Sequence, residues 1–170
     1  MEERSLLNGK KILAVDDEPD ILEFLEEHLN MCQIVKAASF TDAKNLLESQ
    51  DFDAAILDIM GVNGYELLEI ANRRKIPCLM LTAHAFSPDN IVRSIKEGAA
   101  SYVPKEEIAK VEAFLNDIFL AQEKGENPWV SWQERLPGSY FRMRFGAAWD
   151  AADDQFRNAL KDVLRSRSKT

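Results

Sequence analysis

The chain has 170 residues, of which 46% are apolar, and this suits one domain of ordinary size with room for an appendage. Its formal charge of -8 argues against non-specific binding of nucleic acid or anionic membranes by the whole surface. No apolar run is long enough to span a membrane and the first residues do not resemble a signal peptide, so we expect a cytoplasmic protein without membrane contact.

Short apolar runs alternate with segments of helical periodicity up to residue 121. The predicted strands lie at residues 11–15, 33–38, 54–58, 77–81 and 101–103. The predicted helices begin at Pro19, near Ser39 or Thr41, after Gly64, at Ser87-Pro88-Asp89 and at residue 106, the last running over 106–121. This alternation predicts an α/β fold, a doubly wound five-stranded parallel sheet. We take its strand order to be the flavodoxin-like order 2-1-3-4-5.

A second region is expected beyond that sheet, so we divide the chain into a body, 1–121, and a helical C-terminal extension, 122–170. Gly125 and Pro128 predict a helix stop and a short linker. An amphipathic helix is expected from Phe145 onward, preceded over 129–144 by a shorter helix that is broken at Pro137-Gly138. All three tryptophans lie in this tail: Trp129, Trp132 and Trp149.

The tail also differs from the body in charge. Residues 1–120 carry 12 Lys and Arg against 22 Asp and Glu, whereas residues 121–170 carry 9 against 7. Its aromatic content predicts buried contacts or a binding hot spot. The tail could pack on its own body, pair with a second copy or dock on a partner protein, and these three alternatives stay open at this point.

Charged and polar side chains stand where the predicted strands end. They are Asp16 and Asp17 after the first strand, Asp58 at the end of the third, Thr82 after the fourth and Lys105 after the fifth. Ligands of open parallel sheets bind just beyond the carboxyl ends of the strands. The first and third strands are neighbours about 4.8 Å apart in this order, so three carboxylates would crowd one crevice.

Such a cluster favours a bound cation, because like charges at this distance repel one another. Mg²⁺ typically takes one or two carboxylates together with waters and phosphate oxygens. A carboxylate nucleophile, a metal, the Lys105 ammonium and the Thr82 hydroxyl would together accept a phosphoryl group. The plainer interpretation is that Asp16 and Asp17 only stabilise a helix N-terminus and that Thr82 only caps a turn.

Five motifs occur in order at these strand ends: Ile12-Leu-Ala-Val-Asp16-Asp17-Glu18-Pro19, Leu57-Asp58-Ile-Met60, Leu81-Thr82-Ala83, Gly98-Ala99-Ala100 and Tyr102-Val-Pro-Lys105. A chain that carries them closely resembles the receiver domains of bacterial two-component response regulators. The resemblance implies that Asp58 accepts a phosphoryl group from a phosphohistidine of a sensor histidine kinase. It also implies that Asp16, Asp17, Asp58 and the backbone carbonyl of Met60 hold Mg²⁺ or Mn²⁺.

The same resemblance implies contacts to the phosphoryl group and a switch. Lys105 and Ala83 would contact phosphoryl oxygens, while Thr82 would move toward the phosphoryl group and Tyr102 would turn inward as it does so. His84 is expected either in an exposed loop or over the phosphoryl group. Such a protein is not an enzyme in the turnover sense, although receivers catalyse their own phosphorylation and slow dephosphorylation.

A receiver also needs an output. The resemblance implies a downstream protein or a second copy, reached through the tail or through the face formed by the helix that starts at 88, the strand 101–103 and the helix 106–121. DNA binding by the basic tail is the alternative, although no convincing helix-turn-helix is present. Two other functions are disfavoured. A flavodoxin-like cofactor binder would need a Ser, Thr or Gly-rich loop after the first strand, where this chain has Asp16-Asp17-Glu18. A haloacid dehalogenase-type phosphatase would need a second Asp where this chain has Met60.

Two departures from the family pattern carry expectations. Gly61 replaces the usual proline, which predicts a looser loop after Asp58. Glu106 follows Lys105 where the family usually has proline, so we expect a trans peptide bond there. Cys32 and Cys78 are expected to be reduced thiols about 14 Å apart, too far for a disulfide.

Overall fold

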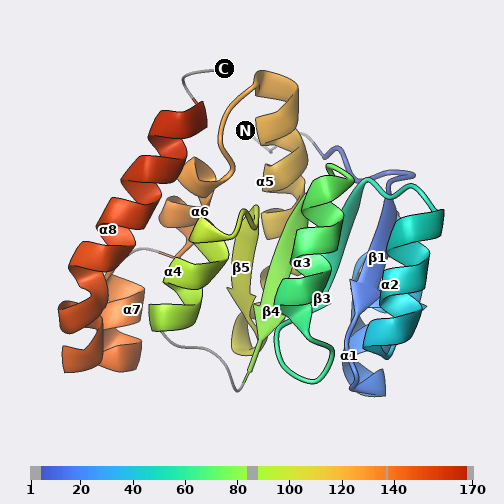
Figure 1. Ribbon diagram of the computed structural model, residues 1–170, viewed down its shortest axis with the longest axis horizontal. Coiled ribbons are helices and arrows are strands. Elements are labelled where there is room, and N and C mark those ends of the chain that lie inside the picture. Colours follow the sequence, from blue (N-terminus) through green and yellow to red (C-terminus); the bar gives the residue numbers. More distant parts are fainter. Residues whose placement is uncertain (1–4, 84–87, 137, 168–170) are drawn as a thin grey trace.

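The computed structural model describes residues 5–83, 88–136 and 138–167 (Figure 1). One parallel sheet has the strand order β2-β1-β3-β4-β5, which confirms the predicted order. Its strands are β1 Lys11–Val15, β2 Gln33–Ala37, β3 Ala54–Asp58, β4 Cys78–Thr82 and β5 Ser101–Pro104. The body helices are α1 Pro19–His28, α2 Phe40–Ser49, α3 Gly64–Arg73, α4 Pro88–Lys96 and α5 Val111–Lys124.

The central strands lie in the core of the body. Every residue of β3 and β4 is buried, because helices cover both faces of the sheet (Figure 1). Parallel strands that are covered on both sides need continuous apolar sequence, and runs such as Ala54–Leu57 and Cys78–Leu81 provide it. The sheet therefore holds the residues at its carboxyl edge on a rigid support.

The last helix of the body is the element whose predicted bounds were wrong. The helix expected over 106–121 is a 3-10 helix, η1 Lys105–Lys110, followed by α5. Glu107 interrupts the regular geometry with φ -106° and ψ 15°. The helix α5 ends at Lys124, three residues later than expected. Gly125 terminates it with a left-handed backbone conformation (φ 69°), which glycine adopts without steric strain. The predicted division between residues 121 and 122 thus falls inside α5.

The tail forms three helices, α6 Trp129–Arg135, α7 Gly138–Phe145 and α8 Ala147–Arg167. They stand beside α4 and β5, and α8 lies along α4 (Figure 1). Of the three alternatives for the tail, packing on its own body is the one seen here. His84 and Ser87, for which the sequence makes predictions, lie outside the described residues.

Two smaller expectations are also tested by the fold. Cys32 and Cys78 are free thiols, as expected, and burial raises the pKa of the Cys32 thiol to about 11. Burial raises the pKa of the Cys78 thiol further still. Within residues 5–83, 88–136 and 138–167, no helix has the length and apolar character needed to cross a membrane.

Candidate functional site

The strand register brings the predicted site residues to one edge of the sheet. Val15 of β1 pairs with Leu57 of β3. The residues that follow them, Asp16 and Asp58, therefore lie at the same level of the sheet. Asp58 pairs with Leu81, and Thr82 pairs with Pro104, the residue before Lys105. The positions of the acids, the hydroxyl and the amine at this edge thus follow directly from the pairing of β1, β3, β4 and β5.

A cavity of about 280 Å³ opens at this edge. It is lined by Asp17, Glu18, Asp58, Met60, Gly61, Ala83 and Lys105. The cavity is therefore lined by three expected metal ligands, Asp17, Asp58 and Met60, and by the two expected phosphoryl contacts, Ala83 and Lys105. The expected switch residues Thr82 and Tyr102 do not line it. Asp16 and Thr82 are fully buried close by, and so is Tyr102.

The Lys105 ammonium is shared between three carboxylates. Its Nζ atom lies 3.0 Å from Asp16 Oδ2, 3.4 Å from Glu18 Oε1 and 3.5 Å from Asp58 Oδ1. The peptide bond between Lys105 and Glu106 is trans, which confirms the expectation, and Lys105 still reaches the site. Glu18 is a partner that our sequence reasoning did not assign, although it belongs to the acidic run after β1.

The single Lys105 ammonium does not neutralise the three carboxylates of Asp16, Glu18 and Asp58 around it. Burial, the charge of Asp16 and, to a smaller extent, that of Asp17 raise the pKa of Asp58 to about 7, against the opposing effect of Lys105. Burial also raises the pKa of Asp16, although the Glu18 N–H donates a hydrogen bond of 2.9 Å to Asp16 Oδ1. Burial acts to lower the pKa of Lys105, but Asp16, Asp58 and Glu18 outweigh it and raise that pKa.

The donor atoms suit a hard divalent cation. Carboxylate oxygens of Asp16, Asp17 and Glu18 lie within 4.8 Å of one another. Asp16 Oδ2 is buried and accepts no hydrogen bond of good geometry, despite the nearby Lys105 ammonium. An under-satisfied buried carboxylate among other carboxylates is an arrangement that Mg²⁺ or Mn²⁺ would stabilise.

Two glycines after β3 press close to the site, where the sequence had predicted a looser loop. Gly61 has φ +82°, and a Cβ atom there would lie 2.5 Å from Asp17 Oδ2. A Cβ atom on Gly64 would lie 2.3 Å from the backbone oxygen of Asp58. The loop can approach these carboxylates and the end of β3 only because both positions lack a side chain.

The comparisons with known proteins agree with this geometry. The family model of the response regulator receiver domain matches residues 12–115. The chain belongs to this family. The match ends before α6, so the tail lies outside it.

Several curated response regulators are similar to this chain. The heme response regulator HssR of Staphylococcus haemolyticus is 37% identical over an alignment of 158 positions, and the match covers 79% of this chain and 70% of that protein. Response regulator GtcR of Aneurinibacillus migulanus is 32% identical over 128 residues, and two-component response regulator ARR18 of Arabidopsis thaliana 36% over 103 residues. The chain spans 52% of the length of GtcR and 16% of that of ARR18.

Solved receiver structures resemble the body. A CheY-like response regulator receiver domain protein from Methanospirillum hungatei is 27% identical, with a TM-score of 0.60, and the match covers 69% of this chain and 99% of that one. Response regulator protein TrrA from Thermotoga maritima, in complex with Mg²⁺-BeF, is 31% identical, with a TM-score of 0.54, and covers 64% and 98%. These matches leave about a third of this chain uncovered.

Proposed function

We propose that this receiver accepts a phosphoryl group on Asp58 from a phosphohistidine of a sensor histidine kinase, in the cytoplasm and with a divalent cation. The observation that carries the proposal is the position of Asp58. Its side chain is 5% exposed at the end of β3, lies 3.5 Å from the Lys105 ammonium and lines the same cavity as Asp17 and Glu18. The receiver family itself, shown by residues 12–115, supports the same conclusion.

The reaction needs little covalent chemistry from the protein. An Asp58 carboxylate oxygen attacks phosphorus while the phosphorus–nitrogen bond of the phosphohistidine breaks, and its electron pair stays on the imidazole nitrogen. Only ionised Asp58 is a nucleophile, and burial together with the charges of Asp16 and Asp17 raises its pKa and opposes ionisation. Lys105 favours the ionised form and would neutralise the charge of the transferred group.

A bound Mg²⁺ or Mn²⁺ would supply the remaining positive charge at the phosphoryl oxygens. We assign it to Asp17, Asp58 and the backbone carbonyl of Met60, with Asp16 bound directly or through water. Ala83 and Lys105 would contact phosphoryl oxygens. Thr82 would move toward the phosphoryl group, so that the modification alters a protein-interaction surface. Tyr102, expected to turn inward in that step, is already fully buried here, and we propose that it repacks next to Thr82.

The other functions have weaker support. Three acids within 4.8 Å of one another after β1 would repel the phosphate of a flavin-type cofactor. Met60 stands where a haloacid dehalogenase-type phosphatase needs a second acid. DNA binding by the tail has less support because two of its nine basic residues, Arg135 and Arg144, pair with Asp117 and Glu106 of the body.

Labelling with acetyl phosphate tests the proposal. We expect Mg²⁺-dependent labelling of the wild type, followed by intact mass, and none for Asp58→Asn. Asp53→Asn is a matched control, because Asp53 precedes the same strand at its opposite end and accepts a hydrogen bond from Lys11 N–H. Labelling that persists in Asp58→Asn would identify a different acceptor and overturn the assignment.

A further inference from the structure

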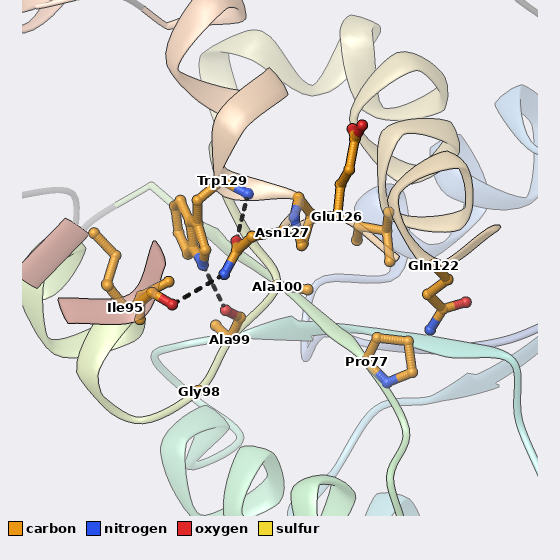
Figure 2. Close-up of a pocket in the computed structure, with 12 residues that line it drawn as sticks. Pro77, Ile95, Gly98, Ala99, Ala100, Gln122, Glu126, Asn127 and Trp129 are labelled. Carbon is orange, nitrogen blue, oxygen red and sulfur yellow. Dashed lines mark hydrogen bonds between the residues drawn. The ribbon is translucent and has the colours of Figure 1, made fainter. Parts of the chain in front are cut away.

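Two indole groups fasten the tail to the body, one to the edge strand β5 and one to a residue two positions before that strand. Trp129 Nε1 donates to Ala99 O at 2.9 Å, and Trp132 Nε1 donates to Tyr102 O at 2.7 Å. Figure 2 shows the first of these bonds. Both indoles are at most 2% exposed. The tail thus contacts the strand that leads directly into Lys105.

The three tail helices are joined into one unit by stacked aromatic rings. Phe141 of α7 lies 4.7 Å from Trp149 of α8 and 5.6 Å from Trp132 of α6, measured between ring centroids. Phe156 of α8 lies 5.0 Å from Trp149. Because the rings bury one another, we expect α6, α7 and α8 to move together.

Polar contacts join this unit to two acids of the body. Arg135 of α6 forms a two-pronged ion pair with Asp117 of α5, at 2.5 and 3.0 Å. Glu106 Oε1 accepts a hydrogen bond of 2.8 Å from the Tyr140 hydroxyl and pairs at 2.8 Å with Arg144 Nε. With α8 along α4 and α6 on β5, the tail contacts all three elements of the α4–β5–α5 face.

Glu106 links the tail to the phosphoryl-acceptor site. It follows Lys105, whose ammonium is divided among Asp16, Glu18 and Asp58. Both residues lie in η1, a 3-10 helix with irregular geometry at Glu107 that connects β5 to α5. A phosphoryl group on Asp58 would carry about 1.5 to 2 negative charges in place of the single carboxylate charge, and would draw Lys105 toward it.

The seam between tail and body is also incompletely packed. A cavity of about 350 Å³ lies at its far end, next to Trp129, with Ala99 and Ile118 of the body and Asn127 and Val163 of the tail region among its lining residues (Figure 2). Water can reach the side chains that line this pocket, so they bury less apolar surface between tail and body than they would in a closed seam. The seam is therefore easier to open than a fully packed core.

We propose that α6–α8 are an internal clasp on the α4–β5–α5 face, and that phosphorylation of Asp58 loosens this clasp through Lys105 and Glu106. The inference rests on the proposed function and deepens it, because it names the segment that occupies the interaction surface before phosphorylation. Movement of Lys105 toward Asp58 shifts Glu106 away from Tyr140 and Arg144, which the aromatic cluster holds in place. The face then becomes available as the tail separates.

Hydrogen exchange of the full chain, followed by mass spectrometry over residues 129–145, tests the clasp. We compare metal-free protein with protein in Mg²⁺ and beryllofluoride, and we measure binding of the mimic separately by fluorine NMR. In the wild type, bound mimic should raise exchange of this segment about tenfold, because opening of the clasp exposes its amides. Tryptophan emission should shift to longer wavelength, since all three indoles are buried tail residues.

Two variants separate the clasp from the site. Glu106→Ala should exchange about tenfold faster than the wild type without the mimic, because its contacts to the tail are removed. Glu107→Ala is the matched control, since Glu107 pairs with Lys110 of the same segment, and it should behave as the wild type.

The outcomes distinguish the two proposals. Bound mimic with unchanged exchange in the wild type would overturn the coupling, whereas unchanged exchange in Glu106→Ala would overturn the role of Glu106 in holding the clasp. Failure of the mimic to bind would count against the proposed function, and the Glu106→Ala measurement would still decide whether Glu106 holds the clasp.

Discussion

The carboxyl edge of the sheet and the seam under the tail are built from opposite kinds of interaction. At the edge, like charges crowd together, and the pKa of Asp58 is raised to about 7. At the seam, buried aromatic rings such as Trp132 and Phe141 stack, and indole N–H groups satisfy backbone carbonyls. The first region gains its chemistry at the cost of stability, and the second contributes stability.

Both regions depend on β5. Its carboxyl end leads into Lys105, which enters the acidic cavity, and the backbone carbonyl of Tyr102 holds Trp132 of the tail. A change in charge at the acidic edge therefore occurs within three residues of the backbone carbonyl that binds the tail. Variants that disturb one region alone test how far this separation extends.

The largest effect is expected at the seam. Trp132→Ala should lower the free energy of unfolding by about 3–5 kcal/mol, because it removes a fully buried ring and leaves the Tyr102 carbonyl without its indole donor. Denaturant unfolding followed by circular dichroism measures the loss. Val130→Ala on the same helix, 45% exposed, should cost less than about 0.5 kcal/mol. If Trp132→Ala lowered the free energy of unfolding no more than Val130→Ala does, the packing of the tail would not contribute to the stability of the body.

The next effect is a pH dependence at the acidic edge. Because the folded-state pKa of Asp58 is raised, the folded protein binds the proton more tightly than the unfolded chain. In metal-free buffer the stabilisation is complete below about pH 4 and is lost as the pH rises to about 7. Asp58→Asn lacks this loss and should be more stable than the wild type at pH 8, by at most about 4 kcal/mol.

Chemical denaturation at a series of pH values checks this prediction. The difference between Asp58→Asn and the wild type should shrink toward zero near pH 4, and Mg²⁺ should reduce it at pH 8 by favouring the carboxylate of the wild type. A difference that stays constant with pH would show that Asp58 has an ordinary pKa.

A smaller effect is expected from the loop after β3. Gly61→Ala should weaken Mg²⁺ binding about tenfold or more, because the added Cβ would collide with the Asp17 carboxylate. Gly9→Ala is the control, since Gly9 has φ +77° and no atom within 4 Å of the added Cβ. Both variants carry about 1–2 kcal/mol of backbone strain. Calorimetric titration with Mg²⁺ should separate them, and equal affinities would contradict the role of Gly61.

The smallest effect concerns the charge pairs of the tail. A double-mutant cycle of Arg135→Gln and Asp117→Asn should give a coupling energy of about 1–2 kcal/mol, because Asp117 is buried and the contact is two-pronged. The same cycle on Arg142 and Asp150, a pair that is 61% and 62% exposed, should give less than about 0.5 kcal/mol. Similar values in unfolding experiments would mean that the seam does not exclude water.

Much of the site follows from local sequence. Asp58 ends an apolar strand, and Lys105 follows another, so their meeting at one edge follows from the parallel strand order alone. Glu18 and Gly61 were not assigned such contacts, because an exposed acid in a helix-start motif and a loop glycine look ordinary in sequence. Their importance depends on how closely the β3–α3 loop and Lys105 approach, and periodicity carries no information about that distance.

The sequence by itself determined the α/β fold, because buried parallel strands need continuous apolar runs. Its five motifs indicated the family, and the flavodoxin-like strand order brings the polar residues that follow these runs together at the carboxyl edge. Only the tertiary structure decided where the tail lies. An amphipathic, aromatic segment buries equally well against its own body, a second copy or a partner, and its sequence is the same in each case. The contacts of Trp132 with β5, and of Tyr140 and Arg144 with Glu106, distinguish the first arrangement from the others.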